Sequence, residues 1–116
     1  MASLSQPKVE VNAAEKKVYA YVPDKMNDEL IQSFLAQYGK AVNSITPGEY
    51  HLEVDCTEMK VISPELVPSL EGTMGMYVKD GFGKVTFVVS GSPVFKMQMM
   101  RIARSAGLDL EIVDAK

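Results

Sequence analysis

The chain is poor in the side chains from which most catalytic and metal sites are built. Its 116 residues include one cysteine, one histidine and no tryptophan. One cysteine cannot form an intrachain disulfide, and one histidine cannot supply the imidazole cluster of a typical zinc site. The single thiol suggests a reducing compartment. We therefore expect a cytoplasmic protein.

Long apolar runs and an excess of basic residues are also missing. No run approaches the roughly 18 residues that a membrane span needs. The first residues, MASLSQPKVEVNAAEKK, lack the apolar segment of a secretory signal. The 12 basic and 15 acidic residues leave a net charge of −3. This charge disfavours nucleic acid and anionic membranes as partners, so we expect neither.

The composition predicts one globular domain. Hydrophobic residues make up 47% of the chain and charged residues 23%. A chain of this length can bury one hydrophobic core. Because residues 1–7 are polar, we expect a flexible N-terminus at 1–7 and a single domain over 8–116.

Hydrophobic periodicity predicts alternating strands and helices. Strands are expected at 8–11, 18–22, 50–54, 85–89 and 110–113, where β-branched and aromatic residues gather. The pattern predicts an α/β fold: a single domain with a mixed sheet of four to five strands and about three helices packed on it.

Capping residues predict where the helices begin and end. The first helix is expected after the N-cap Asn27, and the second from about Glu65, with Pro68 in its first turn. The third is expected from Pro93 to Ala106, with Ser92 as its N-cap and Gly107 closing it.

Two details of this pattern are specific enough to test. The continuous apolar run VTFVV at 85–89 predicts a strand that is covered on both faces. In the second helix, the spacing predicts a core face made of Leu66, Leu70, Met74, Tyr77 and Val78.

The stretch from Tyr50 to Asp80 organises our prediction of a site. A strand ends at Asp55, a polar connection follows, and Ser63-Pro64 starts a helix. In open α/β sheets, ligands bind outside the carboxyl ends of the strands. We therefore expect the working surface at this edge of the sheet.

Three pieces of the sequence resemble one family. YHLEVDCTEMKVI leads into a helix, KVTFVVSGSP joins a strand to a helix start, and a helix ends in SAGLDLEIV. Together, over roughly residues 9–113, they resemble a STAS domain, the family of bacterial anti-sigma-factor antagonists and related modules in transporters. The resemblance implies a STAS-like fold and a regulatory role through binding of a protein partner.

The helix start departs from the family pattern. Where the antagonists carry Asp-Ser-Ser-Gly, this chain has Ser63-Pro64-Glu65-Leu66. The second serine of the family is the phosphorylation site that switches partner binding, and Glu65 stands there. A carboxylate cannot accept a phosphate from a serine kinase, although it places negative charge at a helix N-terminus. We expect a constitutive or degenerate interaction module that is non-catalytic and needs no cofactor or metal.

The resemblance implies a partner-binding surface on the loop and the helix start. Its expected residues are Asp55, Thr57, Glu58, Ser63, Glu65, Leu66 and Ser69. Helical spacing predicts a second exposed surface on the third helix. It consists of Met97, Met100, Arg101 and Arg104. The expected partner is a kinase-like or other regulatory protein, and a homodimer is an open alternative.

Two other classes of function stay open. One is a small-molecule binder that holds a nucleotide or a lipid. The other is an enzyme that uses Cys56, or a Mg²⁺ site formed by Asp55, Glu58 and Glu65. The sequence shows no base to activate the thiol and no acidic pair after the first long strand. His51 fits a polar position in mid-strand.

Overall fold

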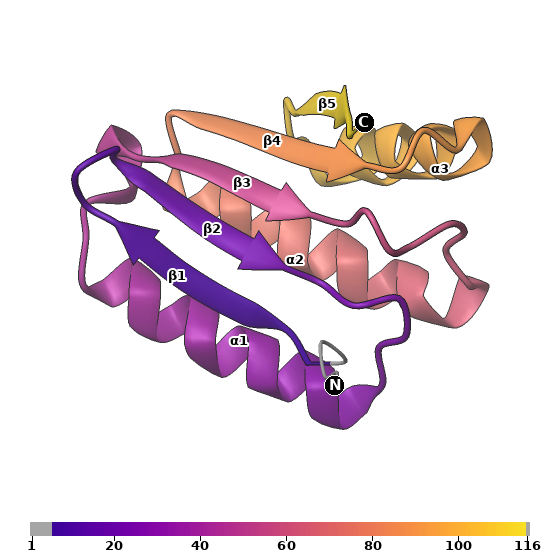
Figure 1. Cartoon of the computed structure of the whole chain (residues 1–116), viewed down its shortest axis with the longest axis horizontal. Coiled ribbons are helices and arrows are strands. Elements are labelled where there is room, and N and C mark those ends of the chain that lie inside the picture. Colours follow the sequence, from indigo (N-terminus) through magenta and orange to yellow (C-terminus); the bar gives the residue numbers. More distant parts are fainter. Residues whose placement is uncertain (1–5, 116) are drawn as a thin grey trace.

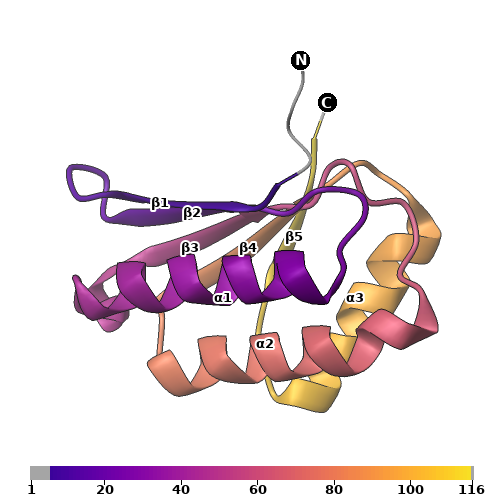
Figure 2. The ribbon, with the colours of Figure 1, turned by 90° about the horizontal axis from the view of Figure 1, so that it is seen from below.

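The computed structural model describes residues 6–115, which form a layer of sheet and a layer of helices (Figures 1 and 2). The elements are β1 (Lys8–Asn12), β2 (Lys17–Tyr21), α1 (Asp28–Asn43), β3 (His51–Asp55), α2 (Val67–Asp80), β4 (Lys84–Val89), α3 (Pro93–Ala106) and β5 (Glu111–Asp114). Short 3₁₀ turns, Pro47–Glu49 and Pro64–Leu66, precede β3 and α2. The predicted α/β fold with a mixed sheet is confirmed.

The five strands of this sheet lie in the order of the sequence, β1-β2-β3-β4-β5. β1 pairs antiparallel with β2, and the remaining pairs are parallel. Each parallel crossover steps to the next strand in the same direction, and such crossovers are right-handed in about 98% of cases. All three helices therefore pack on one face of the sheet, as Figure 2 shows.

The opposite face of the sheet has no helix over it. Alternate residues of each strand point to this side. The strand register places their side chains in rows, of which one is basic and the next is mostly acidic. The basic row is Lys17, His51 and Lys84, and the next is Glu53, Thr86 and Glu111. Ion pairs join the rows, Lys17 to Glu53 at 3.7 Å and Lys84 to Glu111 at 2.9 Å.

β4 is buried on its helix side and largely covered on the other side, as its apolar run predicts, although no helix lies on that other side. Phe87 faces the helices and lines the core with them, whereas Thr86 and Val88, which alternate with it, face the side without helices. Thr86 is nevertheless only 5% exposed. Its hydroxyl lies 2.7 Å from His51 Nε2 and 3.4 Å from a Glu111 oxygen. The cover on this face therefore comes from long polar side chains of the neighbouring strands.

The predicted capping residues bound the helices. The side chains of Asn27 and Ser92 accept hydrogen bonds from first-turn amides of α1 and α3, at 2.8 Å and 3.2 Å. Gly107 ends α3 with a φ of 79°, a left-handed conformation that favours glycine. α2 has no side-chain cap and follows the 3₁₀ turn directly, so Pro68 lies in its first turn as predicted.

The core lies between the sheet and the helices, and α2 contributes a narrower stripe to it than predicted. Met74 and Tyr77 are buried, and Leu66 and Leu70 are partly buried against the core. Val78 is 43% exposed, so its predicted place on the core face is wrong. The reason is rotational: the buried stripe of α2 follows Leu70, Met74 and Tyr77, and Val78 is turned past it toward solvent.

Part of the predicted flexible segment 1–7 lies outside the described residues. Pro7, at its end, is buried. The Gln37 side chain of α1 donates to the Pro7 carbonyl at 3.1 Å and accepts from the Val9 amide at 2.9 Å. These bonds fasten the start of β1 to α1.

Candidate functional site

The connection between β3 and α2, residues 56–63, is irregular, but its inner side is fixed to the domain. Ile62 is buried, with 2% exposure. The Gln98 side chain of α3 accepts from the Ile62 amide at 2.9 Å and donates to the Ile62 carbonyl at 3.0 Å. The Ser92 hydroxyl donates to the Lys60 carbonyl at 3.3 Å. The connection therefore lies along the first half of α3 in a defined conformation.

Asp55 holds the beginning of this connection. Its Oδ1 accepts a hydrogen bond from the Thr57 amide at 2.9 Å and another from the Thr57 hydroxyl at 2.7 Å. This side-chain turn is typical of aspartate at the end of a strand. Beside it, burial and a hydrogen bond to Glu58 raise the pKa of Tyr21 to about 12. Asp55 and Thr57, both half-buried, thus shape the loop.

The outer side of the connection is open to solvent. Glu58, Ser63 and Glu65 are exposed, and so is Val61, at 61%. Glu65 lies in the 3₁₀ turn directly before α2. Backbone N–H groups at a helix start lack partners within the helix, so a negative charge is favourable there.

The predicted exposed face of α3 is confirmed. Met97 is 62% exposed and Met100 is 47% exposed, and Arg101 and Arg104 are exposed beside them. Val94, which the sequence analysis did not single out, is 57% exposed at the start of the same helix. The apolar end of this face lies next to the β3–α2 connection, because Gln98 and Ser92 bind that connection from α3.

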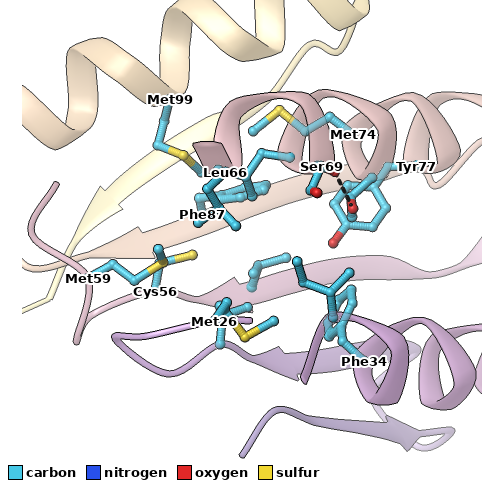
Figure 3. Close-up of a pocket in the computed structure, with 15 residues that line it drawn as sticks. Met26, Phe34, Cys56, Met59, Leu66, Ser69, Met74, Tyr77, Phe87 and Met99 are labelled. Carbon is cyan, nitrogen blue, oxygen red and sulfur yellow. Dashed lines mark hydrogen bonds between the residues drawn. The ribbon is translucent and has the colours of Figure 1, made fainter. Parts of the chain in front are cut away.

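An apolar cavity of about 50 Å³ lies beneath the start of α2 (Figure 3). Its walls come from all three helices, from the ends of β2 and β3, and from β4. Four methionines and two phenylalanines account for much of the wall. They are Met26, Met59, Met74, Met99, Phe34 and Phe87. Leu66 and Ser69, which the resemblance placed on the partner surface, line this cavity.

Two stripes of α2 face this cavity. Leu66, Leu70 and Met74 form an apolar stripe at intervals of four residues. Ser69, Thr73 and Tyr77 form a parallel stripe of hydroxyl groups, also at intervals of four. The dashed line in Figure 3 is the hydrogen bond from the Thr73 hydroxyl to the Ser69 carbonyl, at 2.8 Å.

The Tyr77 hydroxyl makes no hydrogen bond within residues 6–115, although the residue is only 3% exposed. In residues 6–115, every side-chain oxygen or nitrogen that water cannot reach makes a hydrogen bond. The Tyr77 oxygen must therefore touch open space, and Figure 3 shows it pointing into the cavity. Burial raises the pKa of this hydroxyl, so it stays protonated and able to donate.

A wider groove of about 490 Å³ between α1 and α2 adjoins the cavity. Ile31, Ser69 and Thr73 line both spaces, so the two meet there. The mouth of the cavity thus carries hydroxyl groups, and its interior is apolar.

The catalytic alternatives find no support in the described residues. Cys56 is unpaired and 3% exposed, and burial raises the pKa of its thiol, which disfavours the reactive thiolate. Residues 6–115 contain no cluster of three or more side chains able to hold a metal ion. In the same part of the chain, no helix is long and apolar enough to cross a membrane.

The lining of the cavity separates the two small molecules that the sequence left open. A nucleotide carries several phosphate charges, and no residue that lines the cavity, all within positions 22–99, is charged. The walls therefore fit an apolar molecule and do not fit a nucleotide.

The predicted partner-binding residues fall into separate groups. Glu58, Ser63 and Glu65 face solvent, Asp55 and Thr57 brace the loop, and Leu66 and Ser69 line the cavity. Gln98 and the role of Tyr77 were not predicted from the sequence. The sequence held two signals of these roles. Gln98 is a polar residue between the apolar Phe95 and Met99, and Tyr77 places a hydroxyl group on the core face of its helix.

Comparison with known proteins returned no relatives: no family model, no curated protein and no solved structure matches the chain.

Proposed function

We propose that this protein is a non-catalytic regulatory module that binds a protein partner through the β3–α2 connection and the adjoining start of α3. We call this area the loop surface. It consists of Glu58, Lys60, Val61, Ser63, Glu65, Val94 and Met97. A STAS-like identity, suggested by sequence, belongs to the same proposal.

The strongest support for this function is that the β3–α2 connection is bonded to the domain on its inner side and exposed to solvent on its outer side. The bonds from Gln98 to Ile62 hold the backbone, while Val61, Val94 and Met97 leave more than half of their surface exposed. A loop that is already ordered loses little conformational entropy on binding. Exposed apolar side chains beside charged ones are typical of protein-binding surfaces.

The charge of Glu65 defines the kind of partner. It is exposed at the start of α2, where the resemblance places a carboxylate in the position of the family's phosphorylated serine. A partner segment with apolar side chains for Val61 and Met97 and a basic side chain for Glu65 would complement this surface. A kinase-like or other regulatory protein is the expected source of such a segment.

The second exposed surface, Met97 with Met100, Arg101 and Arg104, extends the loop surface along α3. Methionine side chains adapt to different partners, and arginine forms paired hydrogen bonds with carboxylates. We assign to it the same partner, with acidic residues opposite the arginines. A cytoplasmic location is part of the proposal, because the one cysteine is buried and unpaired.

The test is capture of partners from a lysate of the source organism with immobilised wild-type, Glu65→Lys, Val61→Asp and Glu10→Lys proteins. Glu10 is an exposed acidic residue of β1 and serves as the control. We expect one protein to bind the wild type and Glu10→Lys, and to be lost with the other two. Cross-links from Lys60 would place that protein on the loop surface. A protein held equally by all four variants, or no retained protein, would refute the proposal.

Self-association is measured separately by sedimentation. If the wild-type chain forms a dimer that Val61→Asp dissociates, the partner is a second copy of the chain and the proposed regulatory protein is wrong.

A further inference from the structure

We propose that the cavity beneath α2 is a binding site for a neutral aliphatic molecule that carries a hydroxyl or carbonyl group at one end. The polar end would bind the Tyr77 hydroxyl, which points into the cavity, and the aliphatic end would lie against the methionine side chains of the lining. This site does not depend on the loop surface or on any partner protein.

The unpaired Tyr77 hydroxyl is the first argument. The residue is 97% buried by its 3% exposure, yet its oxygen bonds no group in residues 6–115 and faces the cavity. The oxygen itself is not sealed from contact with a water-sized molecule, so its hydrogen-bonding capacity is available in the open space of the cavity. A ligand oxygen in the cavity would supply the missing partner.

The shape of the lining is the second argument. The hydroxyls of Ser69, Thr73 and Tyr77 lie on one stripe of α2, and the interior beyond them is apolar. A cavity needs roughly 10–15 Å³ of such volume to hold one water molecule. The cavity, at about 50 Å³, therefore has room for a few non-hydrogen atoms. Flexible methionine side chains can enlarge it to admit a short chain.

The absence of charge in the lining is the third argument, and it sets the ligand class. A carboxylate or phosphate would lose its hydration without meeting a cation, which is costly. Asp28, the charged residue that lines the adjoining groove, would repel an anion further. The geometry favours a fatty alcohol, aldehyde or ester over a free fatty acid.

Methionine methyl groups provide a direct readout of binding. With ¹³C-methyl methionine, Met26, Met59, Met74 and Met99 report on the cavity. The exposed Met97 and Met100 report on adsorption to the surface. Titration with 1-hexanol at millimolar concentration should shift the four cavity signals in a saturable way and leave the two surface signals in place. Hexanoate should bind at least about tenfold more weakly, because its charge would be buried without a partner.

Three variants test the geometry. Tyr77→Phe should weaken 1-hexanol binding about fivefold, the usual effect of one lost neutral hydrogen bond. Ser69→Phe, at an exposed position on the mouth, should abolish the shifts of the cavity signals. Tyr38→Phe is the matched control: its hydroxyl binds Asp80 away from the cavity, so the affinity for 1-hexanol should not change.

The proposal is wrong if the four cavity signals do not move, if Met97 and Met100 move with them, or if hexanoate binds as tightly as 1-hexanol. Equal affinity of the wild type and Tyr77→Phe would also refute the role of the hydroxyl. These outcomes are independent of whether a partner protein is captured by the loop surface.

Discussion

Tyr38 and Tyr77 contact each other in the core, with ring centroids 5.4 Å apart and ring planes tilted by 53°. Their hydroxyl groups differ in their surroundings. Tyr38 donates a hydrogen bond to Asp80 at 2.5 Å, whereas Tyr77 has no partner in the described part of the chain. Burial raises the pKa of both hydroxyls, so both remain protonated at neutral pH.

This difference predicts opposite effects of the same substitution. Tyr38→Phe should lower the free energy of unfolding by about 1–2 kcal/mol, because a hydrogen bond to a carboxylate is lost. Tyr77→Phe should leave the free energy unchanged or raise it by up to about 1 kcal/mol, because the hydroxyl that is removed bonds no group in residues 6–115. Urea denaturation of both variants beside the wild type measures this. A loss for Tyr77→Phe as large as that for Tyr38→Phe would mean that its hydroxyl has a partner in solution.

Gln98 should control the order of the β3–α2 connection. Gln98→Ala removes both bonds to the Ile62 backbone, which should cost about 1–2 kcal/mol of stability. It should also speed amide hydrogen exchange at residues 59–62. Gln32→Ala is the control, since Gln32 is an exposed glutamine of α1. Unchanged exchange at Ile62 in Gln98→Ala would show that other contacts hold the loop, and would remove the main support for a pre-ordered loop surface.

The open face of the sheet should make stability depend on pH through His51. Burial lowers the pKa of His51, and the neighbouring Lys17 and Lys84 lower it further. The unfolded chain therefore binds a proton at a higher pH than the folded chain does, so stability rises with pH across that interval. As pH falls from 7.5 to 5.5, the melting temperature should drop in the wild type and drop less in His51→Gln.

Thermal melts at several pH values, in the same salt, test this sign. No other histidine exists to titrate in this range. A parallel fall in the wild type and in His51→Gln would contradict the assignment. At lower pH both proteins should lose stability. Hydrogen bonding and ion pairing with Lys84 depress the pKa of Glu111, and the stability that this gives is lost as Glu111 takes up a proton.

Cys56 should be inert in the folded protein. It is 3% exposed, and burial raises the pKa of its thiol. Reaction with a chromogenic thiol reagent at pH 8 should be at least about a hundredfold slower in the native protein than in urea, because it requires local opening. Rapid modification without denaturant would contradict this prediction and would favour the alternative of an enzyme that uses the Cys56 thiol.

Local sequence signals predicted the elements and their limits well. Asn27 and Ser92 begin α1 and α3, and Gly107 ends α3, because capping depends on a few neighbouring backbone groups. Alternation and helical spacing correctly predicted the exposed side of α3. An error arose where burial depends on distant neighbours, because Val78 is turned outward. The burial of Thr86 was predicted, but the polar side chains of adjacent strands that cover it were not.

The sequence by itself determined the fold class, the order of the elements and most of the core, because periodicity and capping act over a few residues. Only the tertiary structure decided that all helices share one face, which follows from strands added in one direction. It also decided that Gln98 fastens a loop 36 positions away and that Tyr77 lacks a hydrogen-bond partner among the described residues. These relationships join residues far apart in the chain, and packing alone brings such residues together.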